Sequence, residues 1–211
     1  PESGGCTLGT NVIHKAANIL SAYLVQSPST LYHSWNVLEV FAGNGSASCI
    51  LQQAFAQVEW TATDLCEYTN TKMEVLRCDA LTAVELFGSQ ANMLVLVSPP
   101  PYSPVSHSGP NDDLGFADYF AIREFLSLQK EQKPQKTKWI LFLGELGASD
   151  GSTGMYSFLM EHPRLSLELR EVLERFPTGF PFGDDEAVKE LFLFKTKSKT
   201  CKKIDMVQKT K

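Results

Sequence analysis

The chain has 211 residues, of which 43% are apolar and 20% are charged, which is typical of one globular domain with a substantial core. No apolar run approaches the roughly 20 residues that span a bilayer, and the N-terminus lacks the charged start and apolar core of a signal peptide. We therefore expect a soluble intracellular protein, cytoplasmic or nuclear. Because the chain begins at Pro1 and not at Met, we also expect a processed or excised fragment of a longer chain.

The charge is unevenly distributed. Seven lysines and one aspartate lie between Lys195 and Lys211, so the net charge of −5 leaves about −11 on the remainder of the chain. An acidic body argues against a strong, independent grip on a phosphate backbone. The lysine-rich tail is either a solvated, disordered end or a nucleic-acid contact.

The cysteines are scattered and form no CxxC pair, and no histidine lies near them at the spacing of zinc ligands. This pattern predicts reduced thiols in an intracellular protein, with no metal site and no disulfide scaffold. The five cysteines are Cys6, Cys49, Cys66, Cys78 and Cys201.

Helical and strand patterns alternate along the chain, which predicts crossover connections and a parallel sheet. The expected helices are Thr10–Leu24, Ser46–Ala56, Thr82–Phe87, Phe116–Gln129 and Met155–Glu161. The expected strands are Val37–Phe41, Val58–Thr63, Met73–Arg77, Met93–Val97 and Trp139–Leu143, followed by a hairpin-like pair, Leu165–Phe176 and Val188–Lys195.

Two of the expected strands end abruptly in residues that shape the backbone. Val37–Phe41 leads into the glycine turn Gly43-Asn44-Gly45, and Met93–Val97 leads into Ser98-Pro99-Pro100-Pro101-Tyr102. In open α/β sheets, ligands bind in the crevice outside the carboxyl ends of the strands. We therefore expect both turns to border one ligand site.

The order and chemistry of the two turns resemble those of class I methyltransferases that use S-adenosylmethionine (SAM). The closest likeness is to the amino-methyltransferases, which carry an [Asn/Asp/Ser]-Pro-Pro-[Tyr/Phe/Trp] turn after the fourth strand. The resemblance implies a Rossmann-like, seven-stranded, mostly parallel sheet with helices on both faces and a C-terminal antiparallel strand. It also implies an N-terminal helical segment at residues 1–35, a methyltransferase domain at 36–195 and the lysine-rich tail at 196–211.

SAM needs an acceptor for its ammonium group, a close backbone approach to its methionine part and a carboxylate for its ribose diol. The complete GxGxxG pattern is absent because Gly43 to Ser48 ends in serine, so another nucleotide or a vestigial site remains an alternative. By resemblance, the first motif comprises Glu39, Phe41, Gly43, Asn44 and Gly45, the ribose position is Asp64 with Leu65, and the adenine position is Cys78 with Asp79.

The proline turn carries the expected reaction. By resemblance, Ser98 and a backbone carbonyl accept hydrogen bonds from the target amino group, Pro99 and Pro100 stiffen the turn, and Tyr102 stacks on the planar target. Pro101 occupies the place of the aromatic residue. Either Tyr102 is displaced, or the loop bulges so that Tyr102 stacks normally, or the turn is purely structural.

Further residues are candidates for the substrate pocket. His107 and Asp112 to Asp113 lie in the loop after the proline turn and could approach the substrate. Glu145 follows the fifth expected strand and could line the pocket, as could Phe180 and Phe182, although this phenylalanine pair could instead pack the hairpin against the sheet.

The resulting hypothesis is a SAM-dependent N-methyltransferase that acts on an amino group of a nucleic-acid base, with RNA favoured over DNA. A base in a duplex would have to be unpaired or flipped to reach the turn. The acidic body implies that a protein partner, a flanking domain or the lysine-rich tail helps to recognise the substrate. The alternatives are a catalytically inactive scaffold or binding subunit and a protein glutamine N-methyltransferase.

Overall fold

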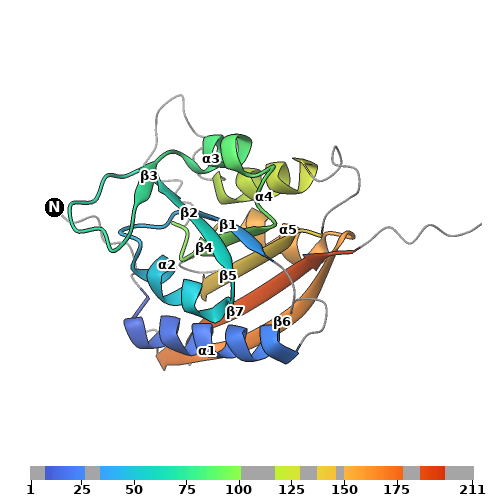
Figure 1. The fold of residues 1–211 in the computed structure, drawn as a ribbon. Helices are drawn as coiled ribbons and strands as arrows, with labels where there is room; N and C mark the ends of the chain where they lie inside the picture. The colour runs from blue at the N-terminus through green and yellow to red at the C-terminus, as the bar shows by residue number, and fades with distance from the viewer. Residues whose placement is uncertain are drawn as a thin grey trace, which may run out of the picture.

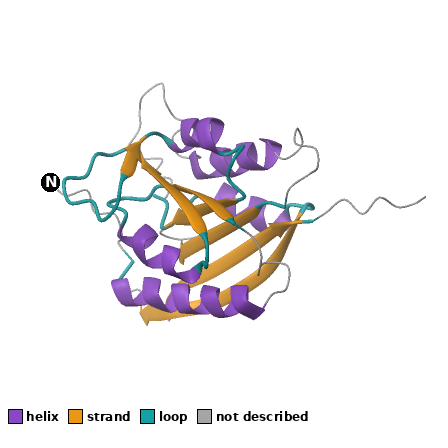
Figure 2. Ribbon diagram, viewed as in Figure 1, coloured by secondary structure: helices purple, strands orange, loops and turns teal. Residues whose placement is uncertain are grey.

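The computed structural model describes residues 8–26, 34–100, 117–128, 137–145, 150–177 and 186–197. These residues form a seven-stranded sheet with helices on both faces (Figures 1 and 2). The strand order is β3-β2-β1-β4-β5-β7-β6, and β7 runs antiparallel to β5 and β6 while the other neighbouring strands pair in parallel. The expected Rossmann-like sheet with an antiparallel C-terminal strand is therefore confirmed.

The strands lie close to their expected positions, although β3 is shorter than expected and begins two residues later than Met73. Their bounds are β1 Trp35–Val40, β2 Val58–Asp64, β3 Val75–Arg77, β4 Met93–Val97, β5 Trp139–Glu145, β6 Leu165–Pro177 and β7 Glu186–Thr196.

The expected helices are also present, with one correction. The segment Ser46–Ala56 is not one continuous helix, because α2 ends at Leu51, a 3-10 turn follows, and Phe55 has extended backbone with φ −111°. The bounds are α1 Thr10–Gln26, α2 Ser46–Leu51, η1 Gln52–Ala54, α3 Ala80–Phe87, α4 Ala117–Leu128 and α5 Thr153–Glu161.

The sheet is buried on both faces, which explains why its central strands are continuous apolar runs. Successive side chains of a strand point to opposite faces, so Met93 and Val95 pack with α1 and α2. Leu94 and Leu96 pack on the other face with α3, α4 and α5. In Figure 1, α1 and α2 lie below the sheet while α3 and α4 lie above it.

The strand order reverses between β1 and β4. From β1 the chain moves outward through β2 to β3 and then returns to the other side of β1, where Val40 lies opposite Leu96. Because β1 and β4 are parallel, their carboxyl ends lie side by side, and with them the glycine turn and the start of the proline turn at Ser98. This reversal is the place where open α/β sheets form a ligand crevice.

None of the helices within the described ranges is long and apolar enough to cross a membrane.

Candidate active site

The glycine turn after β1 depends on left-handed backbone. Gly43 has φ +58° and Gly45 has φ +76°, a region that residues with a Cβ rarely adopt. A Cβ on Gly45 would also lie 2.7 Å from Cγ of Met73, whereas a Cβ on Gly43 would meet no heavy atom within 4 Å. Gly45 is thus required for packing, while Gly43 leaves space beside the turn.

Asp64, at the end of β2, fixes this turn. Its Oδ2 accepts a hydrogen bond from the Gly43 N–H at 2.9 Å, and its Oδ1 accepts one from the Cys66 N–H at 2.8 Å. The Ala42 N–H also donates to the Thr63 carbonyl at 3.0 Å. A carboxylate has about four acceptor sites, so Asp64 retains capacity for ligand hydroxyls while it holds the turn.

The residues expected at the adenine position lie next to Asp64. The Cys78 N–H donates to the Asp64 carbonyl at 2.9 Å. Asp79 is the N-cap of α3 and accepts hydrogen bonds from the Leu81 and Thr82 N–H groups, a role that the sequence interpretation missed. The hydrogen bonds from Thr82 lower the pKa of Asp79, and Leu65 is exposed beside this group.

Glu39 is the most perturbed acid of the site. It lies fully buried on β1, where its Oε2 accepts a hydrogen bond from Nε1 of Trp60 at 2.7 Å. Burial raises the pKa of Glu39 from 4.5 to about 7, and the neighbouring polar side chains of Ser48 and Trp60 oppose that rise. Oε1 of Glu39 and Oγ of Ser48 are buried without a hydrogen-bond partner in the described part of the chain.

Within the described ranges, two residues other than glycine have positive φ, and they follow the two adjacent strands at the reversal. Phe41 follows β1 with φ 62°, and Ser98 follows β4 with φ 42°. Such strain costs of the order of 1–3 kcal/mol per residue and concentrates at functional sites. Both strained residues therefore stand at the ends of the strands between which the order reverses.

The proline turn is anchored at its start. The Ser98 N–H donates to the Leu143 carbonyl at 2.8 Å, Pro99 is buried and Pro100 is exposed. The described residues do not include several that were singled out in the sequence, namely Pro101, Tyr102, His107, Asp112 to Asp113, Phe180 and Phe182.

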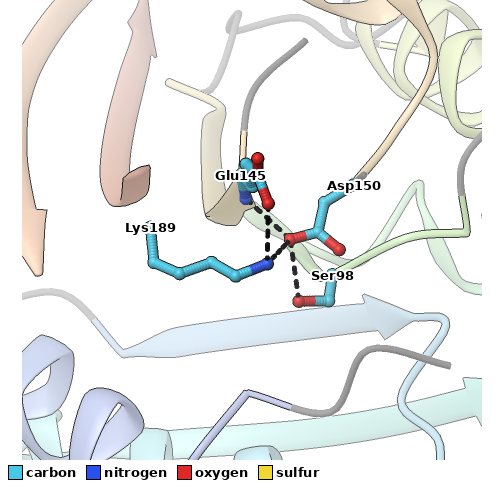
Figure 3. A network of polar contacts seen from close by, with 4 residues as sticks. All are labelled: Ser98, Glu145, Asp150 and Lys189. Carbon is cyan, nitrogen blue, oxygen red and sulfur yellow. Dashed lines mark hydrogen bonds and ion pairs between the residues drawn. The ribbon is translucent and has the colours of Figure 1, made fainter. Parts of the chain in front are cut away.

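The side chain of Ser98 joins a buried network that sequence reasoning missed (Figure 3). Ser98 Oγ donates to Oδ2 of Asp150 at 3.3 Å, and the same oxygen lies 2.6 Å from Nζ of Lys189. The Glu145 N–H donates a hydrogen bond to Oδ2 of Asp150 at 2.7 Å, and Oε2 of Glu145 forms an ion pair with Nζ of Lys189 at 3.5 Å. Of the three residues that join Ser98 in this network, only Glu145 was predicted near the site.

The residues that follow Asp150 tie the proline turn to two helices. The Gly151 N–H donates to the Pro99 carbonyl at 2.7 Å, and Ser152 donates through its N–H and Oγ to buried Asp118 of α4. Ser152 also caps α5 by accepting from the Met155 N–H. An Asp-Gly-Ser sequence signals a helix start, but nothing in it signals a contact with a strand end fifty residues earlier.

Within the residues that the structure describes, no group of three His, Cys, Asp or Glu side chains could hold a metal ion. No protein-family model matches this chain, and no curated protein matches it.

Solved structures do match. A candidate rRNA methylase from Clostridium thermocellum aligns over 90% of this chain and 100% of its own, with a TM-score of 0.50 and 11% identity. Magnesium protoporphyrin IX methyltransferase from Synechocystis PCC 6803, solved with bound SAM, aligns over 88% of this chain and 80% of its own (TM-score 0.49, 14% identity). A didemethyltoxoflavin N1-methyltransferase from Burkholderia thailandensis aligns over 89% and 79% (TM-score 0.47, 15% identity).

The fold is the Rossmann-like methyltransferase fold. At such low identity the likeness establishes the architecture, and the function has to be argued from the residues at the strand ends.

The Lys189 network provides a test of the site's internal electrostatics. Lys189→Met should lower the free energy of unfolding by about 3–5 kcal/mol, because the carboxylate of Asp150, with only 3% of its side chain exposed, loses its cation. The matched control is Arg77→Met, which breaks an exposed pair with Glu67 and should cost less than about 1 kcal/mol. Urea unfolding measures both, and equal small losses would contradict the buried network.

The raised pKa of Glu39 should make the free energy of unfolding depend on pH. Folded Glu39 keeps its proton up to about pH 7, whereas an unfolded glutamate releases it near 4.5, so raising the pH through this window favours the unfolded chain. As the pH rises from 4.5 to about 8, the free energy of unfolding of Glu39→Gln should therefore increase relative to that of the unaltered protein by up to about 3 kcal/mol. A difference in unfolding free energy that stays constant across this window would argue against a buried, neutral Glu39.

Proposed function

We propose that this chain is a SAM-dependent methyltransferase that methylates an amino nitrogen, and that its target is a nucleic-acid base, with RNA favoured over DNA. The observation that carries the proposal is the juxtaposition of two turns at the strand reversal. The glycine turn is held by Asp64, and the Ser98-Pro99-Pro100 turn follows the adjacent parallel strand.

The residues at the first three strand ends fit the chemical groups of SAM. The space beside Gly43 admits the methionine part, and the unpartnered Oε1 of Glu39 is an acceptor on the ammonium side. Asp64 has remaining acceptor capacity for the ribose hydroxyls, while Cys78 and Asp79 border the adenine position. A cation at the glycine turn would favour the ionised form of Glu39 and offset the cost of its burial.

When bound, SAM supplies an electrophilic methyl group on its sulfonium sulfur. The protein's task is to orient the nitrogen lone pair of the substrate toward that carbon, which needs little acid or base before transfer. Ser98 Oγ and a backbone carbonyl of the turn accept the two amino hydrogens, and the buried ring of Pro99 fixes their positions. Tyr102 stacks on the planar target. The proton left on the methylated nitrogen is released to solvent.

The charge of the chain bears on its substrate. A body with about −11 charges repels a phosphate backbone, so productive binding of RNA needs a basic partner, a flanking domain or the lysine-rich tail. The shared fold of the candidate rRNA methylase is compatible with an RNA substrate.

A second function has one specific observation in its favour. Both groups that would receive the amino hydrogens are already engaged, Ser98 Oγ with Asp150 and the Pro99 carbonyl with the Gly151 N–H. A methyltransferase-like scaffold without catalysis would use the turn in this way. The Ser98 hydroxyl is engaged as a donor and keeps its acceptor sites, and the Pro99 carbonyl retains a second acceptor site, which is why we favour the enzyme.

Transfer from labelled SAM to total RNA, DNA and protein, measured separately, tests the function and identifies the substrate class. Label in RNA is the expected result, label in protein alone would indicate the glutamine alternative, and no label in any pool would favour the scaffold. Tyr102→Ala should reduce transfer by roughly 5- to 150-fold, since stacking of a base on an aromatic ring is worth about 1–3 kcal/mol.

Tyr102→Phe is the matched control for this variant because it keeps the ring, and it should keep most of the transfer. Calorimetric titration with SAM should give the same affinity for both variants. An equal loss of SAM binding and of transfer in Tyr102→Ala would contradict the role assigned to the turn.

A further inference from the structure

Serine at the first position of the proline turn raises a chemical question about its proton. The side chains of Asn and Asp each present an oxygen without a proton, which can accept a hydrogen bond from an amino group in any state. A serine hydroxyl carries one proton and two acceptor sites. Ser98 accepts reliably from a substrate only if its own proton is directed elsewhere.

The structure provides a destination for that proton. Oδ2 of Asp150 lies 3.3 Å from Ser98 Oγ, and its other neighbours, the Glu145 N–H at 2.7 Å and Lys189 Nζ at 2.6 Å, are both donors (Figure 3). Oδ2 is therefore an acceptor toward Ser98, and the hydroxyl is the donor. The distance is long for a bond to a carboxylate, but hydrogen bonds of catalytic groups are often long before substrate binds.

Asp150 is held in this position from several sides. The side chains of Asp150 and Lys189 are only 3% and 4% exposed, so their ion pair is shielded from water. A Cβ on Gly144 would lie 2.9 Å from Oδ2 of Asp150, so glycine at this place in β5 is what lets the carboxylate approach. The next residue, Gly151, donates its N–H to the Pro99 carbonyl and so fixes the distance between Asp150 and the turn.

We propose that Asp150 is a positioning residue that accepts the hydroxyl proton of Ser98 in a hydrogen bond, so that the remaining lone pairs of Oγ receive an N–H of the substrate's amino group. Lys189 acts through Asp150 by holding its carboxylate in place. The proton stays on Ser98 throughout. The inference rests on the proposed function of amino-group methylation. In it, residues on or next to β5 and β7 orient the hydroxyl of Ser98 in the turn after β4.

The test is a double-mutant cycle on kcat for methyl transfer from labelled SAM to the pool that accepts label. Asp150→Ala is combined with Lys189→Met so that no unpaired cation is left in the interior. This double substitution is made both in the unaltered protein, which keeps Ser98, and in the Ser98→Asn variant. With Ser98, kcat should fall by roughly tenfold or more. With Ser98→Asn the loss should stay below about threefold, because a carboxamide oxygen accepts without help from Asp150.

Two further variants separate positioning from structure. Asp150→Asn keeps an oxygen for the hydroxyl, so in the Ser98 chain it should retain transfer within about threefold. The matched control Arg170→Met with Glu190→Gln removes another ion pair that involves β7, at 2.9 Å, without touching the turn, and it should leave transfer unchanged. Calorimetric SAM affinity and the melting temperature are measured for every chain.

The outcomes are distinct. An equal loss of kcat with Ser98 and with Ser98→Asn would overturn the positioning role while leaving the methyltransferase standing, and so would no loss with Ser98. A tenfold loss in Asp150→Asn with SAM binding and melting intact would also overturn it. If the unaltered protein transfers no label to any pool, the proposed function itself fails and this inference fails with it.

Discussion

Parallel pairing of β1 with both β2 and β4 is the constraint on which the candidate site depends. Because three parallel strands end at one edge of the sheet, the glycine turn lies beside Asp64 on one side and beside the proline turn on the other. The strand order reverses at the same place, where open α/β sheets bind their ligands. The two strained residues, Phe41 and Ser98, mark the two sides of this reversal.

The buried carboxylates of this edge are stabilised in two different ways. Oε2 of Glu39 accepts a hydrogen bond from Trp60, and within the described part of the chain the structure pairs no cation with Glu39, so burial keeps it protonated up to about pH 7. Asp150 instead accepts hydrogen bonds from the Lys189 ammonium group, a backbone N–H and a hydroxyl. These contacts form a network that joins β5 and β7 to the end of β4. The surroundings of Glu39 would therefore be stabilised by a bound cation, whereas those of Asp150 fix the geometry of the turn after β4.

Much of the fold follows from local pattern, because β4 and β5 are continuous apolar runs and the glycines end a buried strand. The strand-end acids Asp64 and Asp79 could be found in the same way. The contact between Ser98 and Asp150 could not, since it joins residues 52 apart through the packing of β5 against β7. The sequence did not indicate the role of Lys189 either. A lysine in a strand is expected on an exposed face, but Lys189, Glu190 and Leu191 are all buried, so both faces of β7 are covered here. After the helix breaks at Leu51, Phe55 packs edge-on against Trp35, which is again a tertiary contact.

If the glycine turn is the cradle of a SAM-type cofactor, calorimetric titration with S-adenosylhomocysteine will register a heat of binding. The unaltered protein should bind, and Gly43→Ala should weaken binding by roughly tenfold or more, because its methyl group enters space that is otherwise free of protein atoms. Gly9→Ala, which also places a methyl group in open space but at the start of α1, should bind as the unaltered protein does. No binding heat with the unaltered protein, or a Gly43→Ala variant that binds as tightly as Gly9→Ala, would rule out a cofactor cradle at the glycine turn.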